Sequence, residues 1–191
     1  MIANSANVTR VFCLIAVIAC LATHKAGSES NYFYVTGSSI KFRSEAALET
    51  ISAESQKAQG LIDISKKTFA FSVLSTSFNG FNSSLQREHF NENYLESEKF
   101  PTTIFKGKII EDIDFTKNGM YDVRAKGTLL LHGISQERII KSKIIVKENG
   151  LEIESRFFVL LNDHNIRIPK VVHEKVAEEI LIEVKLRLER K

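Results

Sequence analysis

Residues 121–131 read YDVRAKGTLLL, and apolar side chains alternate with polar ones along most of this stretch. The odd-numbered positions from Tyr121 to Leu131 are apolar, with Gly127 among them, whereas the even-numbered positions up to Thr128 are polar. Successive side chains of a β-strand point to opposite faces of the sheet, so a period of two indicates a strand. The stretch therefore predicts a β-strand with one apolar face and one face toward water.

The same alternation recurs on both sides of this stretch. Further strands are predicted at residues 32–36, 40–46, 48–58, 68–73, 102–110, 139–146, 151–161 and 179–189. Turn signals lie between them, among them the Asn-Gly pairs at 79–80, 118–119 and 149–150. Many short, one-sided strands joined by tight turns predict an antiparallel sandwich or barrel. Because the chain has only two prolines and few long loops, a continuous meander that closes into a barrel is favoured.

One segment interrupts the strand pattern. The sequence from Ser83 to Gln86 fits a capping box, in which a Ser side chain and a Gln three residues later satisfy free N–H groups at the start of a helix. A short helix is therefore expected at residues 83–97, ending before Pro101. A second helical turn is expected after Pro169.

The first residues have the pattern of an export signal. Arg10 precedes an apolar run at residues 11–22, which is too short to cross a bilayer as a helix. We expect a signal peptide at residues 1–22, with cleavage as late as Ala26, and a periplasmic or otherwise extracytoplasmic domain at residues 31–191. In the alternative, residues 17–20 are a lipoprotein box, and a lipidated Cys20 anchors the protein to a membrane.

Composition excludes several classes of function. Both cysteines, Cys13 and Cys20, lie in the predicted signal, so the domain that follows has no disulfide, thiol nucleophile or thiolate metal site. The formal net charge is +3, and basic and acidic residues are interspersed, so no nucleic-acid surface is expected. The chain has 13 Phe and no Trp, which favours an interior whose large side chains carry no polar atom.

Three segments in matching order carry a family resemblance. Residues 88–107 contain a His on the expected helix, an acidic spacer, a Phe-Pro pair and a strand with Phe near its end; residues 127–135 read GTLLLHGIS, and residues 162–166 read NDHNI. Together they resemble the pattern of the YceI-like family. The sequence departs from that pattern at Gln86, where the family helix usually has Arg, and at His164-Asn165, where an aromatic residue and Gly are common.

The resemblance implies a lipocalin-like antiparallel β-barrel of about eight strands, which is wide enough for a core or for one small ligand. Members of the family hold polyisoprenoid chains, including quinone-like lipids, in an apolar tunnel. The resemblance therefore implies that this chain binds or carries an apolar isoprenoid-type lipid. The alternation supports this, because the apolar strand faces would line the interior, and burying apolar area contributes roughly 25 cal/mol per Å².

The predicted ligand-binding residues are the inward-facing side chains of the strands and two aromatic residues of the helix. They are Phe69, Phe71, Val73, Phe90, Tyr94, Phe105, Tyr121, Val123, Leu129, Phe157 and Val159. On composition alone, the same side chains would also fill a solid barrel without a cavity. The strand pattern leaves these two interpretations open.

Two other functions compete with lipid binding. An enzyme would have to use the histidines, His24, His89, His132, His164 and His173, but none of them shows the spacing of a metal or acid–base motif. We therefore expect no catalytic residues, no metal and no cofactor. The remaining alternative is a ligand-free envelope scaffold or a barrel that binds a partner protein, a homodimer included, because a fold alone does not fix a function.

Overall fold

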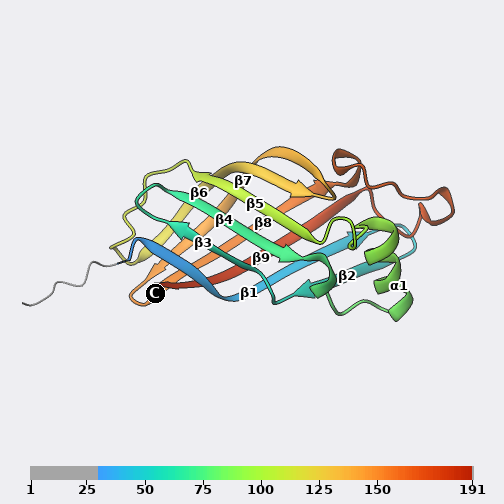
Figure 1. Ribbon diagram of the computed structural model, residues 1–191, viewed down its shortest axis with the longest axis horizontal. Helices are drawn as coiled ribbons and strands as arrows, with labels where there is room; N and C mark the ends of the chain where they lie inside the picture. The colour runs from blue at the N-terminus through green and yellow to red at the C-terminus, as the bar shows by residue number, and fades with distance from the viewer. Residues whose placement is uncertain (1–29, 191) are drawn as a thin grey trace, which may run out of the picture.

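A computed structural model describes residues 30–190. Strands make up most of them, and the short helix and helical turns lie in only two of the connections between strands (Figure 1). The strands are β1 (Tyr32–Glu45), β2 (Thr50–Ser55), β3 (Gln59–Asp63), β4 (Thr68–Leu74), β5 (Thr102–Ile109), β6 (Gly119–Leu131), β7 (Ile134–Lys147), β8 (Gly150–Leu160) and β9 (Glu179–Arg190). The predicted export segment and its Cys20 lie outside these residues and stay a prediction.

The strands form one antiparallel sheet that closes on itself. The order is β2-β1-β3-β4-β5-β6-β7-β8-β9, and β1 also pairs with β9, which joins the two sides into a barrel. One end of β1 pairs with β3 through Tyr32–Tyr34, and the other end pairs with β2 through Ile40–Glu45. Because β2 and β3 share one place beside β1, the ring has eight positions, and the predicted lipocalin-like fold is confirmed.

The strand pairings also explain where the predicted boundaries were wrong. Residues 32–36 and 40–46 belong to a single strand, β1, whose pairing with β9 shifts register between Val35 and Gly37. The predicted strand at 48–58 ends at Ser55, and β3 follows after a break. Both differences depend on how β1 meets distant strands, which local alternation does not report.

The helix is shorter than predicted. The α-helix α1 spans Ser84–His89 and continues as one π-helical turn at Phe90–Tyr94. The Ser83 side chain accepts a hydrogen bond from the Gln86 N–H at 3.2 Å, which confirms the cap. A 3₁₀ turn at Lys170–Val172 follows Pro169, as predicted. Within residues 30–190, no helix is both long enough and apolar enough to span a membrane.

β5 and β6 approach each other unusually closely. Gly107 and Gly127 are register partners in the two strands. A Cβ atom added to Gly127 would lie 2.2 Å from the carbonyl oxygen of Lys106, and one added to Gly107 would lie 2.1 Å from that of Lys126. Side chains at these positions would overlap the backbone, which explains why glycine interrupts the apolar face of residues 121–131.

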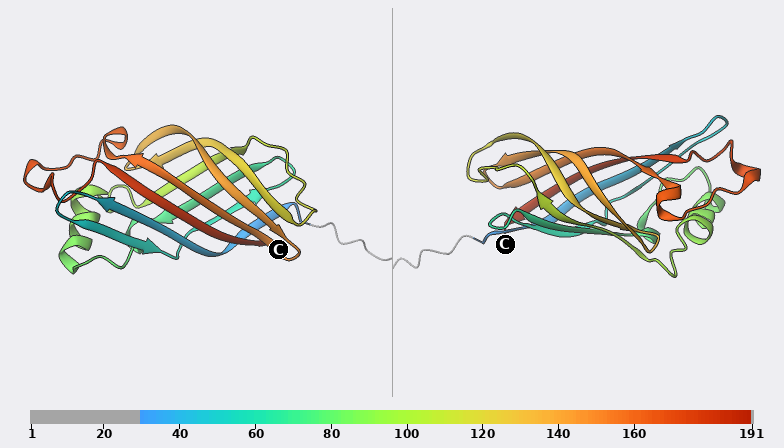
Figure 2. Two further views of the ribbon diagram at one scale, coloured as in Figure 1. Left: turned by 180° about the vertical axis from the view of Figure 1, so that it is seen from behind. Right: turned by 90° about the horizontal axis from the view of Figure 1, so that it is seen from above.

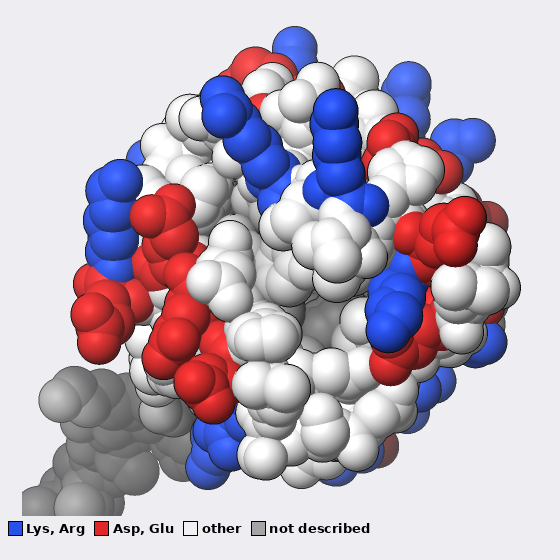
Figure 3. Space-filling model, turned by 90° about the vertical axis from the view of Figure 1, so that its right-hand side faces the viewer, with Lys and Arg blue, Asp and Glu red and all other residues white. Residues whose placement is uncertain are grey.

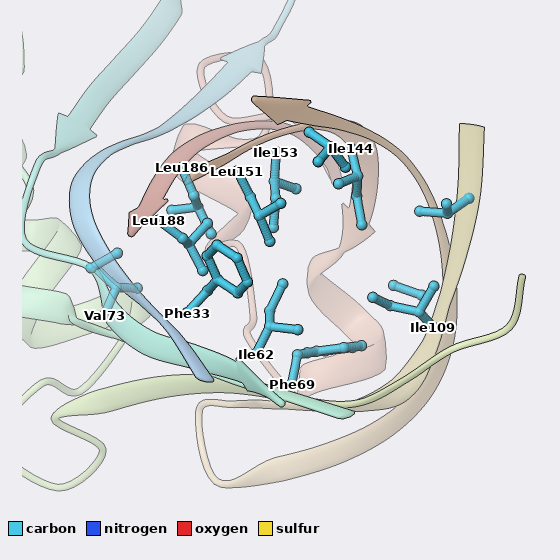
Figure 4. Close-up of a cluster of buried hydrophobic side chains, with 14 of the residues drawn as sticks. Phe33, Ile62, Phe69, Val73, Ile109, Ile144, Leu151, Ile153, Leu186 and Leu188 are labelled. Atoms are coloured by element: carbon cyan, nitrogen blue, oxygen red, sulfur yellow. The ribbon is translucent and has the colours of Figure 1, made fainter. Parts of the chain in front are cut away.

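The barrel has one end filled by side chains, the closed end, and one end with a cavity, the open end. Figures 1 and 2 show which elements lie at each end. At the closed end, β1 starts, β9 ends and the loop between β5 and β6 places the buried Phe115 against the core. Ile62, Ile144 and Leu188 are only 1%, 2% and 0% exposed, so this half is filled with side chains (Figure 4). At the other end lie β2, α1 and the loop at residues 161–178 (Figure 1).

Candidate ligand-binding cavity

A wide cavity occupies the open half of the barrel, with a volume of about 470 Å³. Strands, α1 and the loop before β9 all contribute side chains to its wall, and most of these are apolar. The wall includes Ile40, Phe42, Ile51, Val73, Phe78, Phe81, Phe90, Leu129, Leu131, Phe157, Val159, Ile166, Val172, Val176, Ile180 and Ile182. The alternation of the strands produces this wall, since their inward faces are the apolar ones.

A narrower cavity of about 140 Å³ lies deeper in the barrel. Both cavities touch the same layer of six side chains, one from each of six strands: Ile40, Val73, Thr103, Leu129, Phe157 and Ile182. The two spaces therefore border on the same layer of side chains and lie one behind the other along the barrel. Below this layer, the wall includes Phe69, Phe71, Phe105 and Val123.

The mouth of the wide cavity combines polar groups from three segments. Gln86 and His89 of α1, Glu49 of the β1–β2 turn and Lys175 of the loop before β9 all line it. The Gln86 side-chain amide donates to the Glu49 carboxylate, and the Leu48 N–H donates to the Glu174 carbonyl at 2.9 Å, so the three segments are tied together. Figure 3 looks into this end and shows a hollow whose surround is mostly uncharged.

Four phenylalanines pack beside the helix at the mouth. The rings of Phe42 and Phe90 are stacked, with centroids 5.0 Å apart and planes 7° from parallel. Phe81 lies 5.1 Å and Phe78 5.8 Å from the Phe90 ring. Offset and tilted ring pairs of this kind add to the stability that burial alone provides. Phe90 therefore fixes the helical segment onto the cavity wall.

The comparison with known proteins agrees with this geometry. The sequence pattern of the YceI-like domain matches residues 33–188, which is nearly all of the barrel. The chain belongs to the YceI-like domain family. No curated protein matches the chain at a significant level.

Several solved structures resemble this YceI-like barrel. A polyisoprenoid binding domain from Saccharophagus degradans, implicated in plant cell wall breakdown, has 12% identity and a TM-score of 0.70, with 85% of this chain and 100% of that chain covered. Burkholderia cenocepacia BcnA has 14% identity and a TM-score of 0.64, with 78% and 95% covered. The Campylobacter jejuni YceI protein has 14% identity and a TM-score of 0.54, with 71% and 80% covered. At these identities the likeness shows the fold alone.

The structure places all but one of the predicted wall residues along the two cavities of the YceI-like barrel. The wide cavity is lined by Val73, Phe90, Tyr94, Leu129, Phe157 and Val159, and the narrow one by Phe69, Phe71, Phe105 and Val123. Tyr121 lines neither. It lies near the start of β6, where its hydroxyl donates toward the Lys117 carbonyl at 3.3 Å, because this part of β6 belongs to the closed end.

Sequence reasoning missed other wall residues of the YceI-like barrel. Ile180 and Ile182 belong to the apolar parity of the last strand, so the alternation contained the signal for them. Phe42 lies in a strand with weak alternation, and Phe78 and Phe81 lie in the irregular segment after β4. No local period marks those two positions.

Tyr94 lines the cavity with a polar atom, and burial raises the pKa of its hydroxyl, so it stays protonated at neutral pH.

The histidines of the YceI-like barrel do not converge on a common point. His132 contacts the Glu96 carboxylate at 2.6 Å through Nε2 and donates from Nδ1 to the His164 carbonyl at 2.9 Å, so it fastens the chain after the helix to the β6–β7 turn. His164 is itself fully buried, and His89 lies at the mouth. Among residues 30–190, no three His, Cys, Asp or Glu side chains are grouped to hold a metal ion.

Proposed function

We propose that this YceI-like barrel binds one apolar lipid, with the tail in the apolar interior and the head at the mouth. The observation that carries the proposal is the wide cavity itself, which is lined by apolar side chains and opens at one end of the barrel. A cavity that is concave, largely apolar and equipped with a few polar groups is the usual form of a small-molecule site. The polar groups here lie at the mouth, where a lipid head would meet water.

The accessibility of the inner wall supports an unfilled interior. Phe42, Phe157 and Ile182 face the inside of the barrel, yet they are only partly buried because the cavity leaves space in front of them. Apolar cavities hold water poorly, so this surface favours an apolar occupant. Each methylene group buried there would contribute about 0.8 kcal/mol.

We propose an isoprenoid or quinone-like lipid as the class of ligand. The similar domain from Saccharophagus degradans is described as polyisoprenoid binding, and that description supports the same class of ligand here. A branched isoprenoid tail needs contacts with apolar and aromatic side chains but no charged partner along its length, which suits this wall. The proposal is one of binding or carriage, without a chemical step.

The proposal also places the protein outside the cytoplasm. Its support is the apolar run at residues 11–22, which follows Arg10 in the order of an export signal. Lipidation of Cys20 remains the alternative to ordinary cleavage. The intact mass of the protein from its native envelope would report both the cleavage site and any attached lipid.

The test is to purify the protein from its native envelope without detergent, extract it with organic solvent and analyse the extract by mass spectrometry. We expect an isoprenoid or quinone-like lipid at about one per protein, and uptake of such a lipid by the delipidated protein. An unrelated exported protein, purified in parallel, controls for lipid that adheres during purification. A barrel that carries no lipid and takes up none would favour the scaffold or partner-binding alternative instead.

A further inference from the structure

Two exposed apolar side chains lie beside the mouth of the barrel. Leu48 of the β1–β2 turn is 67% exposed, and Val171 of the loop before β9 is 86% exposed. Both line the same hollow on the surface of this end. Single apolar residues are common on protein surfaces, but two that meet beside the opening of an apolar cavity form a patch. We call Leu48 and Val171 the rim pair.

Backbone hydrogen bonds hold the rim pair in position. The Leu48 N–H donates to the Glu174 carbonyl at 2.9 Å, which ties the β1–β2 turn to the loop. The Val172 N–H donates to the Pro169 carbonyl at 3.0 Å and closes the 3₁₀ turn that carries Val171. The loop itself projects beyond the strands at the open end (Figures 1 and 2). The rim pair is therefore presented to any surface that approaches the mouth.

The loop that carries Val171 also contributes to the cavity wall. Val172 and Val176, which follow Val171 in the sequence, both line the wide cavity. Both are only partly buried, whereas Val171 is almost fully exposed. One short segment therefore presents apolar side chains to the cavity and to the outside of the barrel.

Basic side chains flank the rim pair. Lys170 and Lys175 line the same hollow, and neither takes part in an ion pair within residues 30–190. Glu174 is the acidic residue of this hollow. Free ammonium groups beside exposed apolar side chains suit a surface that has phosphate groups above an apolar layer. Figure 3 shows long basic side chains over one edge of the hollow at this end, with acidic ones at its sides.

We propose that the rim pair and its two lysines dock the open end of the barrel onto an anionic lipid bilayer. Leu48 and Val171 enter the boundary between headgroups and acyl chains, while Lys170 and Lys175 contact phosphates. A bilayer fits this surface better than a folded protein does, because projecting tips insert into a soft layer but need a matching pocket on a rigid partner. The docking surface lies outside the barrel, so the inference goes beyond the proposed function, which concerns the interior.

The first test measures binding to vesicles by co-sedimentation. The exported protein carries Cys20→Ala, so an attached lipid cannot cause the binding. The vesicles consist of phosphatidylcholine alone, or of phosphatidylcholine and phosphatidylglycerol at about two to one. We expect binding to both kinds of vesicle and tighter binding to those with phosphatidylglycerol. This difference should disappear at about 1 M salt, which screens the lysines from the phosphates.

Variants separate the apolar contribution from the basic one. Leu48→Gln combined with Val171→Gln removes the apolar tips without adding a charge, so it should lower the affinity for both vesicles on the order of tenfold. Lys170→Gln combined with Lys175→Gln should abolish only the preference for phosphatidylglycerol. Met120→Gln is the matched control, because Met120 is 61% exposed at the closed end, and it should bind as the wild type does. Equal melting temperatures would exclude unfolding as the cause of any loss.

A fluorescent probe reports contact of the tip itself. The chain has no Trp, so Val171→Trp introduces a single indole at the rim. On docking, its emission should shift to shorter wavelength, and brominated phosphatidylcholine in the vesicles should quench it, because Trp partitions to the membrane interface. Met120→Trp places the same probe at the opposite end and should show neither effect.

Two results would contradict the docking. Wild-type protein that stays in solution with both kinds of vesicle would overturn it and would favour a protein partner for the rim pair. Equal responses of Val171→Trp and Met120→Trp would also overturn it, because the barrel would then bind through another face. Both results leave the proposed function intact, since the lipid content of the native protein is measured separately. A barrel that docks but carries no lipid would overturn the proposed function alone.

Discussion

At the scale of single residues, His164 is the most completely buried polar side chain of the barrel, with 0% exposure. Its Nδ1 lies 3.3 Å from the carbonyl oxygens of both Leu131 and Ile134. The ring therefore contacts the two residues that flank the β6–β7 turn and stabilises it. A carbonyl only accepts hydrogen bonds, which makes Nδ1 the donor. Burial lowers the pKa of His164 from its ordinary value of 6.5, because a charged ring would lose its hydration.

This pKa makes the stability of the fold depend on pH in a defined direction. Well above pH 6.5 the His164 ring is neutral in both the folded and the unfolded chain and contributes no pH dependence. Below it, the unfolded chain binds a proton that the folded protein resists, so the free energy of unfolding should fall, by at most about 1.4 kcal/mol per pH unit. Urea denaturation between pH 5 and 8 would measure this slope.

His164→Asn provides the control for that slope, because its amide nitrogen can donate in place of Nδ1. We expect the variant to be less stable at neutral pH but to lose part of the dependence between pH 5 and 6.5. His132 and its partner Glu96 remain in both proteins and so cancel in the comparison. Identical slopes for the two proteins would show that His164 does not titrate in this way.

At the scale of elements, the helix at the mouth is held by hydrogen bonds at the surface and by one aromatic cluster. α1 contains no buried residue, and its first turn depends on the hydrogen bond from the Gln86 N–H to the Ser83 hydroxyl. Phe90, in the turn that follows, provides the packing onto the wall. The cap at Ser83 therefore acts on α1 itself, whereas Phe90 acts on its attachment to the wall.

Ser83→Ala should loosen α1 selectively. Removing an N-cap side chain costs about 1 kcal/mol, which corresponds to about fivefold faster hydrogen exchange of the amides in the first turn. We expect an unchanged melting temperature, because the strands carry the global stability. Ser84→Ala is the control, since the cap is intact there. A lower melting temperature for Ser83→Ala alone would show that α1 unfolds together with the barrel.

Sequence alone predicted the elements best where their determinants are local. The alternation at residues 121–131 and the cap at Ser83 depend on neighbouring residues, and both are present as predicted. The division of β2 from β3 depends on their pairing with opposite ends of β1, so local alternation could not show it. The wall residues Phe78 and Phe81 were missed for a similar reason, because tertiary packing alone turns them inward.

At the scale of the whole molecule, the sequence left two interpretations of the interior open, a solid core and a ligand cavity. Each of them applies to a different half of the barrel. The closed half is a packed core, and the open half contains most of the cavity. The pattern of apolar positions is the same in both halves, so it predicts which side chains face inward but not how completely they fill the space. That outcome depends on the summed volumes of side chains from all strands.

A charged side chain placed in each half should distinguish the packed core from the half that contains the cavity. Leu151→Arg puts an unpaired charge into the packed core, at a residue that lines neither cavity, which should cost several kcal/mol and unfold most of the protein. Ile182→Arg places the charge in the wall of both cavities, where water can reach it once the lipid leaves. We expect this variant to stay folded and to lose its lipid, as measured by thermal melting and lipid content together. Equal loss of stability in both variants would mean that the two halves are equally filled.

The pairing of Phe33 with Arg190 brings the start of β1 and the end of β9 together at the closed end, opposite the mouth (Figure 1). A tag, a fluorescent protein or a surface linker can be joined to the start of β1 or to the end of β9. Either attachment would therefore begin far from the cavity. Protein immobilised in this way would present its mouth to the solution, so lipid uptake could be followed on a sensor chip without the attachment interfering.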